Sequence, residues 1–297
     1  MTEQKTAAML NGKPRVKKQT HFRMVVRTLR KKRSCMVCLG FLALLILVGI
    51  FAKAIAPYGY EIVDIPNSAQ PPSKAHICGT DDLGRDIFSR LIVGIRYSLG
   101  LGFLAPLINI VIGIIFGAIA GYFGGWTDNI IMRLMDLLQA IPGMMLAILI
   151  SSTLGGGFLN TALALGIGGI PAITRLLRAQ ILTVREMEYL EAARAINCPT
   201  RRQIVRHILP NTFSPLIVSY TMGVGSTILS AASLSYLGLG IQPPLPEWGA
   251  MISGAKTYIR YSPYMILFPG ILLALTVIAI NIFGDGLRDA LDPKMKK

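Results

Sequence analysis

The sequence is poor in charged residues, and this scarcity excludes a chain that folds entirely in water. Asp, Glu, Lys and Arg make up 15% of the 297 residues, whereas hydrophobic residues make up 53%. An ordinary soluble domain carries about a quarter charged residues. The long apolar runs instead predict an all-α integral membrane protein, because a helix satisfies its own backbone polar groups in hydrocarbon.

Residues that bind metals or act in catalysis are also scarce. The three histidines and four cysteines are dispersed along the chain, which argues against a membrane-embedded enzyme. His76 and Cys78 are close in sequence, but two ligands fall short of the usual four of a zinc site. Cys35 and Cys38 form a single CxxC at a predicted helix start, where small apolar residues are the better interpretation. We therefore predict no catalytic residue and no metal site.

Six apolar stretches qualify as membrane spans, each of which needs about 20 mostly apolar residues. The predicted spans are 35–56, 97–123, 130–154, 158–173, 213–234 and 264–283. Pro142 lies inside the third stretch and predicts a kink, because proline removes one backbone donor. In the same stretch Arg133 and Asp136 are three residues apart, which predicts an ion pair near its inner end.

Basic residues set the predicted orientation. Residues 1–34 hold eleven Lys and Arg against a single acidic residue, and such an excess favours the cytoplasmic side. The span count then places both termini in the cytoplasm. A cleaved signal peptide is rejected, because the basic segment is too long and five further spans follow. Contact with the lipid bilayer explains the basic tail, so we predict no nucleic-acid partner.

The predicted organisation follows from these spans. It consists of a basic cytoplasmic tail (1–34), a first transmembrane helix (35–56), an extracytoplasmic loop (57–92), a core of five spans (93–290) and a short cytoplasmic tail (291–297). Within the core, a basic cytoplasmic loop covers about 174–212.

Three glycines recur at every fourth residue of the second span. Gly113, Gly117 and Gly121 therefore lie on one helix face, and this spacing lets two helix backbones approach closely. We favour packing against another span of the same chain. A face against a partner subunit is the alternative.

The most informative segment is MEYLEAARAINCPTRRQIVRHILPN, residues 187–211. The pattern predicts a short amphipathic helix over 188–196, ended by Asn197, which tolerates the left-handed conformation. A second short helix is expected over 201–208, closed by Pro210. The apolar face of the first helix comprises Tyr189, Ala192, Ala193 and Ile196. A soluble partner and the lipid headgroup layer are both suitable environments for these apolar stripes.

This segment resembles the EAA signature in permease subunits of binding-protein-dependent ABC importers, in the dipeptide, oligopeptide and nickel group. The matching residues are Glu191, Ala192, Ala193, Leu209 and Pro210, and Asn197 stands where the signature has Gly. Four further blocks look like the second, C-type, peptide permease and occur in the expected order. They are residues 76–99, 121–142, 234–251 and 284–293.

The resemblance implies a type I ABC importer permease fold in the cytoplasmic (inner) membrane, and a transport subunit that is not an enzyme. A homologous second permease would complete the pore as a heterodimer, two ABC ATPases would each grip one EAA loop, and an extracytoplasmic solute-binding protein would deliver di- or oligopeptides. Glu191 would be the polar anchor for the ATPase. Arg201, Arg202 and Arg206 would favour an acidic groove on it, although positive charge at the inner face explains them equally well.

The chain itself lacks a phosphate-binding loop, which agrees with this division of labour. Its only Gly-Lys pair, Gly12-Lys13, has no Gly at the upstream position that a P-loop needs. ATP and Mg²⁺ are therefore expected on the partner ATPases, and no cofactor on this chain. Nickel, metal chelates and glutathione are alternative solutes. An ion-coupled secondary transporter is a more distant alternative, because no half-to-half repeat is visible. Substrate-binding residues cannot be chosen from the sequence.

Overall fold

The computed structural model describes residues 28–291, and its regular elements in this range are helices. The α-helices are α3 (Arg33–Ile50), α4 (Ala52–Ile55), α5 (Ile87–Phe123), α6 (Gly125–Ala140), α7 (Gly143–Leu154), α8 (Phe158–Arg185), α9 (Glu188–Ala195), α10 (Thr200–Arg202), α11 (Leu209–Tyr236), α12 (Trp248–Ala255) and α13 (Tyr264–Leu291). Two 3-10 turns, η1 (Ile65–Asn67) and η3 (Lys256–Tyr258), and one π-helix, η2 (Gln203–Ile208), complete the set. The predicted all-α class is confirmed for these residues.

Five helical stretches in the described range are long and apolar enough to cross a membrane, and a sixth is a broken pair. The five are Arg33–Ile50, Ile87–Phe123, Phe158–Arg185, Thr200–Tyr236 and Tyr264–Leu291. The predicted kink at Pro142 is instead a complete break, because α6 and α7 meet at 84°. Ile141 and Pro142 both have extended backbones, since a residue before proline is pushed out of the helical region.

Several helices extend beyond their predicted spans. The second begins at Ile87 rather than 97, and α8 continues to Arg185 rather than 173, so both predicted loops are shorter than 57–92 and 174–212. Apolar run length marks only the part of a helix in hydrocarbon, whereas the helix itself continues to its cap. Asp86 provides that cap for α5 by accepting a hydrogen bond from the Ser89 backbone. Residues 1–27 and 292–297 of the predicted tails lie outside the described residues.

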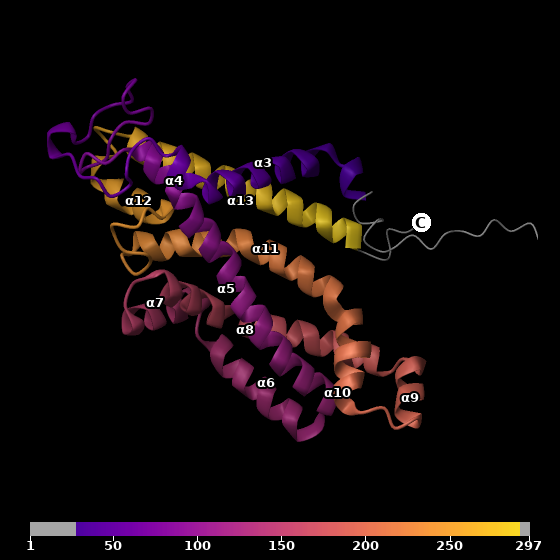
Figure 1. The fold of residues 1–297 in the computed structure, drawn as a ribbon. Helices are drawn as coiled ribbons and strands as arrows, with labels where there is room; N and C mark the ends of the chain where they lie inside the picture. Colours follow the sequence, from indigo (N-terminus) through magenta and orange to yellow (C-terminus); the bar gives the residue numbers. More distant parts are fainter. Residues whose placement is uncertain (1–27, 292–297) are drawn as a thin grey trace, which may run out of the picture.

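The long helices run between two ends of the molecule (Figure 1). Residues 57–86 and α12 gather at one end, on the left in Figure 1, and α9 and α10 lie at the other. The start of α3 and the end of α13 lie together at the α9 end, where Lys32 forms an ion pair with Asp289. Both described chain ends therefore share the side of the molecule that carries α9.

The glycine face of α5 packs against α8 within the chain. A Cβ atom on Gly113 would lie 2.6 Å from Ile173 Cγ2, one on Gly117 2.8 Å from the Thr174 carbonyl oxygen, and one on Gly121 2.9 Å from Ile181 Cβ. Such distances leave no room for a side chain. Leu177 and Ile181 of α8 are fully buried beside this face, so the glycines allow the closest approach of the two helices.

Substitution of Gly117 by Ala is expected to destabilise the protein, because the added methyl group collides with the Thr174 carbonyl. Overpacking of this kind costs about 1–3 kcal/mol. Gly270→Ala in α13 is the matched control, since nothing lies within 4 Å of its added Cβ. Thermal unfolding of the purified protein in detergent should show a lower midpoint for Gly117→Ala only. Equal midpoints would contradict the close α5–α8 contact.

Candidate functional site

Helix α9 has one buried face and one exposed apolar face. Leu190 and Ala193 are buried at 0% and 7% exposure, and Leu190 joins the core cluster that contains Ile181 and Ile208. Tyr189, Ala192 and Ile196 are exposed on the other side, and Ile196 is 80% exposed. The single predicted apolar face was therefore wrong in one respect, because Ala193 belongs to the anchored face. The spacing of three and four residues makes the exposed three a continuous strip.

Asn197 ends α9 in the left-handed conformation, with φ of 52°. Its backbone N–H donates to the Arg194 carbonyl at 2.9 Å, and the Cys198 N–H donates to the Ala193 carbonyl at 3.0 Å. This pair of bonds is the Schellman motif that most often contains Gly. Asn197 therefore makes the turn that the Gly of the signature would make.

Two amide side chains that the sequence analysis missed tie this loop to the long helices. Gln203 is 5% exposed, accepts a 3.0 Å hydrogen bond from the Tyr122 hydroxyl of α5 and donates at 2.7 Å to the Cys198 carbonyl. Asn211 Nδ2 donates to the Tyr189 hydroxyl at 3.2 Å. The tyrosine partners lie 81 residues from Gln203 and 22 residues from Asn211. The sequence therefore offered only one signal for these contacts, which is the presence of two amides among apolar and basic residues.

Pro210 does not close the second short helix, contrary to the prediction. The chain is helical from Thr200 through the π-helix η2 into α11, and Pro210 occupies the first turn of α11. A proline lacks the N–H and crowds the carbonyl four residues earlier, but it is tolerated in a first turn. Leu209 and Pro210 therefore mark the change from π to α geometry, a feature that is frequent at functional sites.

The charged residues of the loop point to solvent. Glu191, Arg201 and Arg202 are exposed, and none of the three forms an ion pair within residues 28–291. The α9–α10 loop, residues 188–202, thus offers an apolar strip, two carboxylates and three guanidinium groups on a backbone that is anchored by its buried face. Such a surface suits a protein partner.

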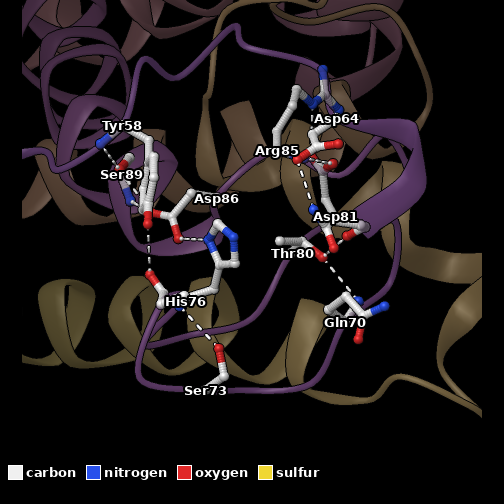
Figure 2. A network of polar contacts seen from close by, with 12 residues as sticks. Tyr58, Asp64, Gln70, Ser73, His76, Thr80, Asp81, Arg85, Asp86 and Ser89 are labelled. Carbon is white, nitrogen blue, oxygen red and sulfur yellow. Dashed lines mark hydrogen bonds and ion pairs between the residues drawn. The ribbon is translucent and has the colours of Figure 1, made fainter.

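The opposite end of the molecule carries a polar network (Figure 2). Asp86 is 3% exposed and accepts hydrogen bonds from the Ser89 backbone at 2.8 Å and the Ser89 hydroxyl at 2.7 Å. Its other oxygen lies 2.9 Å from His76 Nδ1, and the His76 ring packs against Tyr58 at 4.9 Å between centroids. The network fastens residues 57–86 to the first turn of α5.

Cys78 and His76 have different surroundings. His76 faces Asp86, whereas Cys78 is buried, and burial, followed by the charge of Asp86, raises the pKa of the Cys78 thiol to about 11. No group of three or more potential ligands occurs within residues 28–291.

The same end holds a second cluster of charges around Asp81. Arg85 Nε donates to Asp81 at 2.7 Å, and the Asp81 carboxylate also accepts from the backbones of Leu83 and Arg85, each at 2.9 Å. Arg90 is 4% exposed and donates to the Tyr60 carbonyl at 2.9 Å (Arg85, Asp81 and their neighbours appear in Figure 2). These contacts order the loop without an external ligand.

Ion pairs also join the broken third span to α8. The predicted Arg133–Asp136 pair exists at 3.9 Å, but Asp136 lies closer to Arg175, at 2.6 Å. Arg178 makes two bonds of 2.5 Å to Asp128. The helix that leads directly into α9 is thus held to α6 by two arginines.

The chain belongs to the family of binding-protein-dependent transport system inner membrane components, whose model matches residues 113–297. Residues 20–72 match the N-terminal TM domain of oligopeptide transport permease C. The protein is therefore a multi-pass inner-membrane permease subunit of an ABC importer, as the resemblance of the EAA segment implied.

Among named relatives, the chain is similar to the glutathione transport system permease protein GsiD. The GsiD proteins of Shigella boydii serotype 4 (strain Sb227) and Escherichia coli O157:H7 are each 46% identical to it over 293 residues, which cover 97% of both chains.

Solved transporters share the fold. A chain from inward-facing crystals of the MetNI methionine ABC transporter matches with a TM-score of 0.56 and 20% identity, covering 69% of this chain and 98% of that one. A chain from an amino acid ABC transporter crystallised with histidines gives a TM-score of 0.52 at 14% identity, covering 68% and 94%. The type I importer permease fold is therefore shared by the larger part of the chain.

Asn197→Gly should preserve the α9 turn, whereas Asn197→Val should loosen it. A β-branched residue in the left-handed region costs about 1–2 kcal/mol, and glycine adopts the region without strain. Ala195→Val, which places the same side chain at a right-handed helical position, is the control. Amide hydrogen exchange should rise over residues 188–198 in Asn197→Val alone. Unchanged exchange in that variant would refute the proposed requirement for a left-handed residue.

Asp82→Asn is expected to stabilise the protein near neutral pH. Burial and then the charge of Asp81 raise the pKa of the Asp82 carboxyl above its ordinary value of 3.8. The raised pKa means that protonated Asp82 stabilises the native state relative to ionised Asp82. This stabilisation is present in acid and is lost as the pH rises through the raised pKa. The midpoint of thermal unfolding should be higher for Asp82→Asn at about pH 7 and equal to wild type at about pH 3. Glu61→Gln, in the same loop but exposed, serves as the control. A higher wild-type midpoint at neutral pH would contradict the direction of the shift.

Proposed function

We propose that this permease subunit imports small peptides, with glutathione as the first candidate, and that separate ATPase subunits drive it by pressing on the α9–α10 loop. In this scheme a homologous second permease completes the pore. A solute-binding protein delivers the peptide to the end formed by residues 57–86 and α12. ATP and Mg²⁺ are bound by the ATPases, and this chain performs no chemistry.

The observation that carries the coupling proposal is the exposed apolar strip of Tyr189, Ala192 and Ile196 beside the unpaired Glu191. Exposed apolar groups of this kind favour burial against a partner. A small residue at Ala192 allows close contact, and Glu191 supplies a charge that can fix the register. The strip ends at Ile196, directly before the left-handed Asn197, so a force on it would act on a turn that is held by two backbone hydrogen bonds.

Transmission from the loop would follow two routes. Leu190 is packed in the cluster that includes Ile181 of α8, and Gln203 is bonded to Tyr122 of α5. A push on α9 would therefore reach α8 and α5 together, which are the two helices joined at the glycine face. Helix α11 would move with them, because the π-helix connects it to the same loop without a break.

The charge distribution supports a cytoplasmic position for α9. Arg194, Arg201, Arg202 and Arg206 lie within this short segment, and an excess of arginine marks cytoplasmic loops. The start of α3 and the end of α13 lie at the same end of the molecule, which supports a cytoplasmic side for both described chain ends. Residues 57–86, with their acidic side chains, then face the outside.

The choice of solute is supported by the relatives, since GsiD is named for glutathione transport and residues 20–72 match an oligopeptide permease domain. Glutathione is itself a small peptide, so these two names are compatible. Nickel and metal chelates form the competing solute class. The discriminating experiment reconstitutes the chain with its partner subunits in vesicles and measures ATP-dependent uptake of labelled glutathione. Competition by unlabelled di- and tripeptides but not by nickel would support the peptide class, and the reverse pattern would exclude it.

Glu191→Lys is expected to leave the subunit inserted and assembled but to uncouple transport from ATP hydrolysis. The substitution reverses the charge of Glu191, which is next to Ala192 of the exposed strip, and leaves the buried anchor residues intact. Glu186→Lys, an exposed glutamate at the end of α8, makes the same charge change outside the strip and should transport normally. The measurement is solute uptake per ATP hydrolysed in vesicles. Uptake at the wild-type rate in Glu191→Lys would count against the coupling assignment.

A further inference from the structure

A groove of about 500 Å³ opens along the side of the molecule between α3 and α5. Its walls are apolar except at one position. The lining residues are Ile46, Gly49 and Ile50 of α3, and Ile95, Arg96, Leu99 and Phe103 of α5. Arg96 is the one charged group among them.

The groove has a closed floor and an open side. The two helices touch at Gly49, where an added Cβ would lie 2.9 Å from Ile95 Cγ2. Ile95 and Leu99 form the floor at 3% and 5% exposure, whereas Ile50 on the rim is 59% exposed. The seven helical steps from Arg96 to Phe103 correspond to about 10 Å at 1.5 Å per residue. The groove is therefore a narrow apolar slot with a cation near one end.

Arg96 is fixed in position but has no countercharge. Its Nη2 donates to the Ile50 carbonyl at 2.6 Å and its Nε to the Gly49 carbonyl at 2.5 Å. These are carbonyls at the C-terminus of α3, where intrahelical partners run out. Two of the five guanidinium N–H groups are thus used, and Arg96 forms no ion pair with any residue from 28 to 291.

The depth of Arg96 corresponds to the end of the membrane spans. Helix α3 ends at Ile50, and the chain enters the polar end formed by residues 57–86 shortly afterwards (Figure 1). Lys53 of α4 is exposed and lies three residues beyond Ile50, on the way to the polar end formed by residues 57–86. Lys53 also lacks an ion pair with a described residue. Two cations without acidic partners among residues 28–291 therefore lie near the end of α3, where lipid headgroups are expected.

An uncompensated cation at this depth requires an anion from outside the chain. Charged groups at membrane depth are costly unless they are paired or reach the interface. Basic residues next to a bilayer attract anionic headgroups, and an arginine binds phosphate oxygens well because its donors are planar and fixed. The apolar slot runs from this cation toward the interior of the bilayer, in the direction that an acyl chain takes from its phosphate.

We infer that this groove binds one anionic phospholipid, with its phosphate at Arg96 and Lys53 and an acyl chain along Ile46, Leu99 and Phe103. The inference requires only that the chain lies in a membrane, and it does not depend on the solute or on the role of α9. A helix of a second permease subunit is the other occupant that the apolar walls would accept, and the test separates the two.

The test uses the complete transporter purified in detergent and titrated with phosphatidylglycerol or with phosphatidylcholine of the same acyl chains. Bound lipid is counted by native mass spectrometry. Wild type should retain phosphatidylglycerol in preference to phosphatidylcholine. Arg96→Gln and Lys53→Gln should each weaken phosphatidylglycerol binding about fivefold, as expected for one basic residue near a headgroup. Arg133→Gln, which removes an arginine whose side chain is 86% exposed on α6, should have no effect.

A second variant tests whether the loss of lipid in Arg96→Gln could come from a local change in structure. Ile46→Trp fills the slot without touching the Arg96 bonds, and Ile46 is 42% exposed, so the substitution spares the core. It should also displace phosphatidylglycerol while the unfolding midpoint in lipid-free detergent stays at the wild-type value. Equal retention of both lipids, or an equal loss in Arg133→Gln, would overturn the inference. Efficient cross-linking of Phe103→Cys to a second permease chain would overturn it as well, because a protein helix would then occupy the groove.

Discussion

The close contact between α5 and α8 is the constraint on which the rest of this structure depends. Gly113, Gly117 and Gly121 bring the two backbones together over two helical turns, with Cβ clearances below 3 Å. In a bilayer the hydrophobic effect does not drive helices together, so backbone proximity and dispersion must hold them. Helix α8 continues from this contact to Arg185 and leads directly into α9, so the contact helps to position α9. The position of the coupling surface at one end of the molecule thus depends on three glycines in the middle of the second span.

The third span shows how polar contacts compensate for a broken helix. The 84° bend between α6 and α7 means that no continuous helix holds this span in place. Instead, Arg175 and Arg178 of α8 hold α6 through ion pairs with Asp136 and Asp128. Since α8 also leads directly into the α9–α10 loop, these ion pairs connect the broken span to the surface that we propose for the ATPase.

The two ends of the molecule differ in how far their polar side chains are paired. At the α9 end, a fixed backbone presents an exposed apolar strip together with Glu191, Arg201 and Arg202, which form no ion pair within residues 28–291. At the other end, polar side chains mostly satisfy one another, as the Asp86 and Asp81 clusters do. Arg96 and Lys53 are exceptions near this end, and their lack of acidic partners is the reason for placing a lipid in the adjacent groove.

The sequence by itself determined the membrane class, the approximate positions of the spans, the EAA segment and the left-handed turn at Asn197. These depend on apolar run length, local charge and the conformational tolerance of single residues, which are local properties. Helix boundaries, the break at Pro142 and the continuation through Pro210 depended on capping and packing, so the spans predicted from hydropathy were too short. The division of α9 into buried Ala193 and exposed Ala192, and the partners of Gln203 and Arg96, were decided only by the tertiary structure. Residues distant in sequence meet at each of these positions, and their pairing is set by the packing of whole helices rather than by any local pattern.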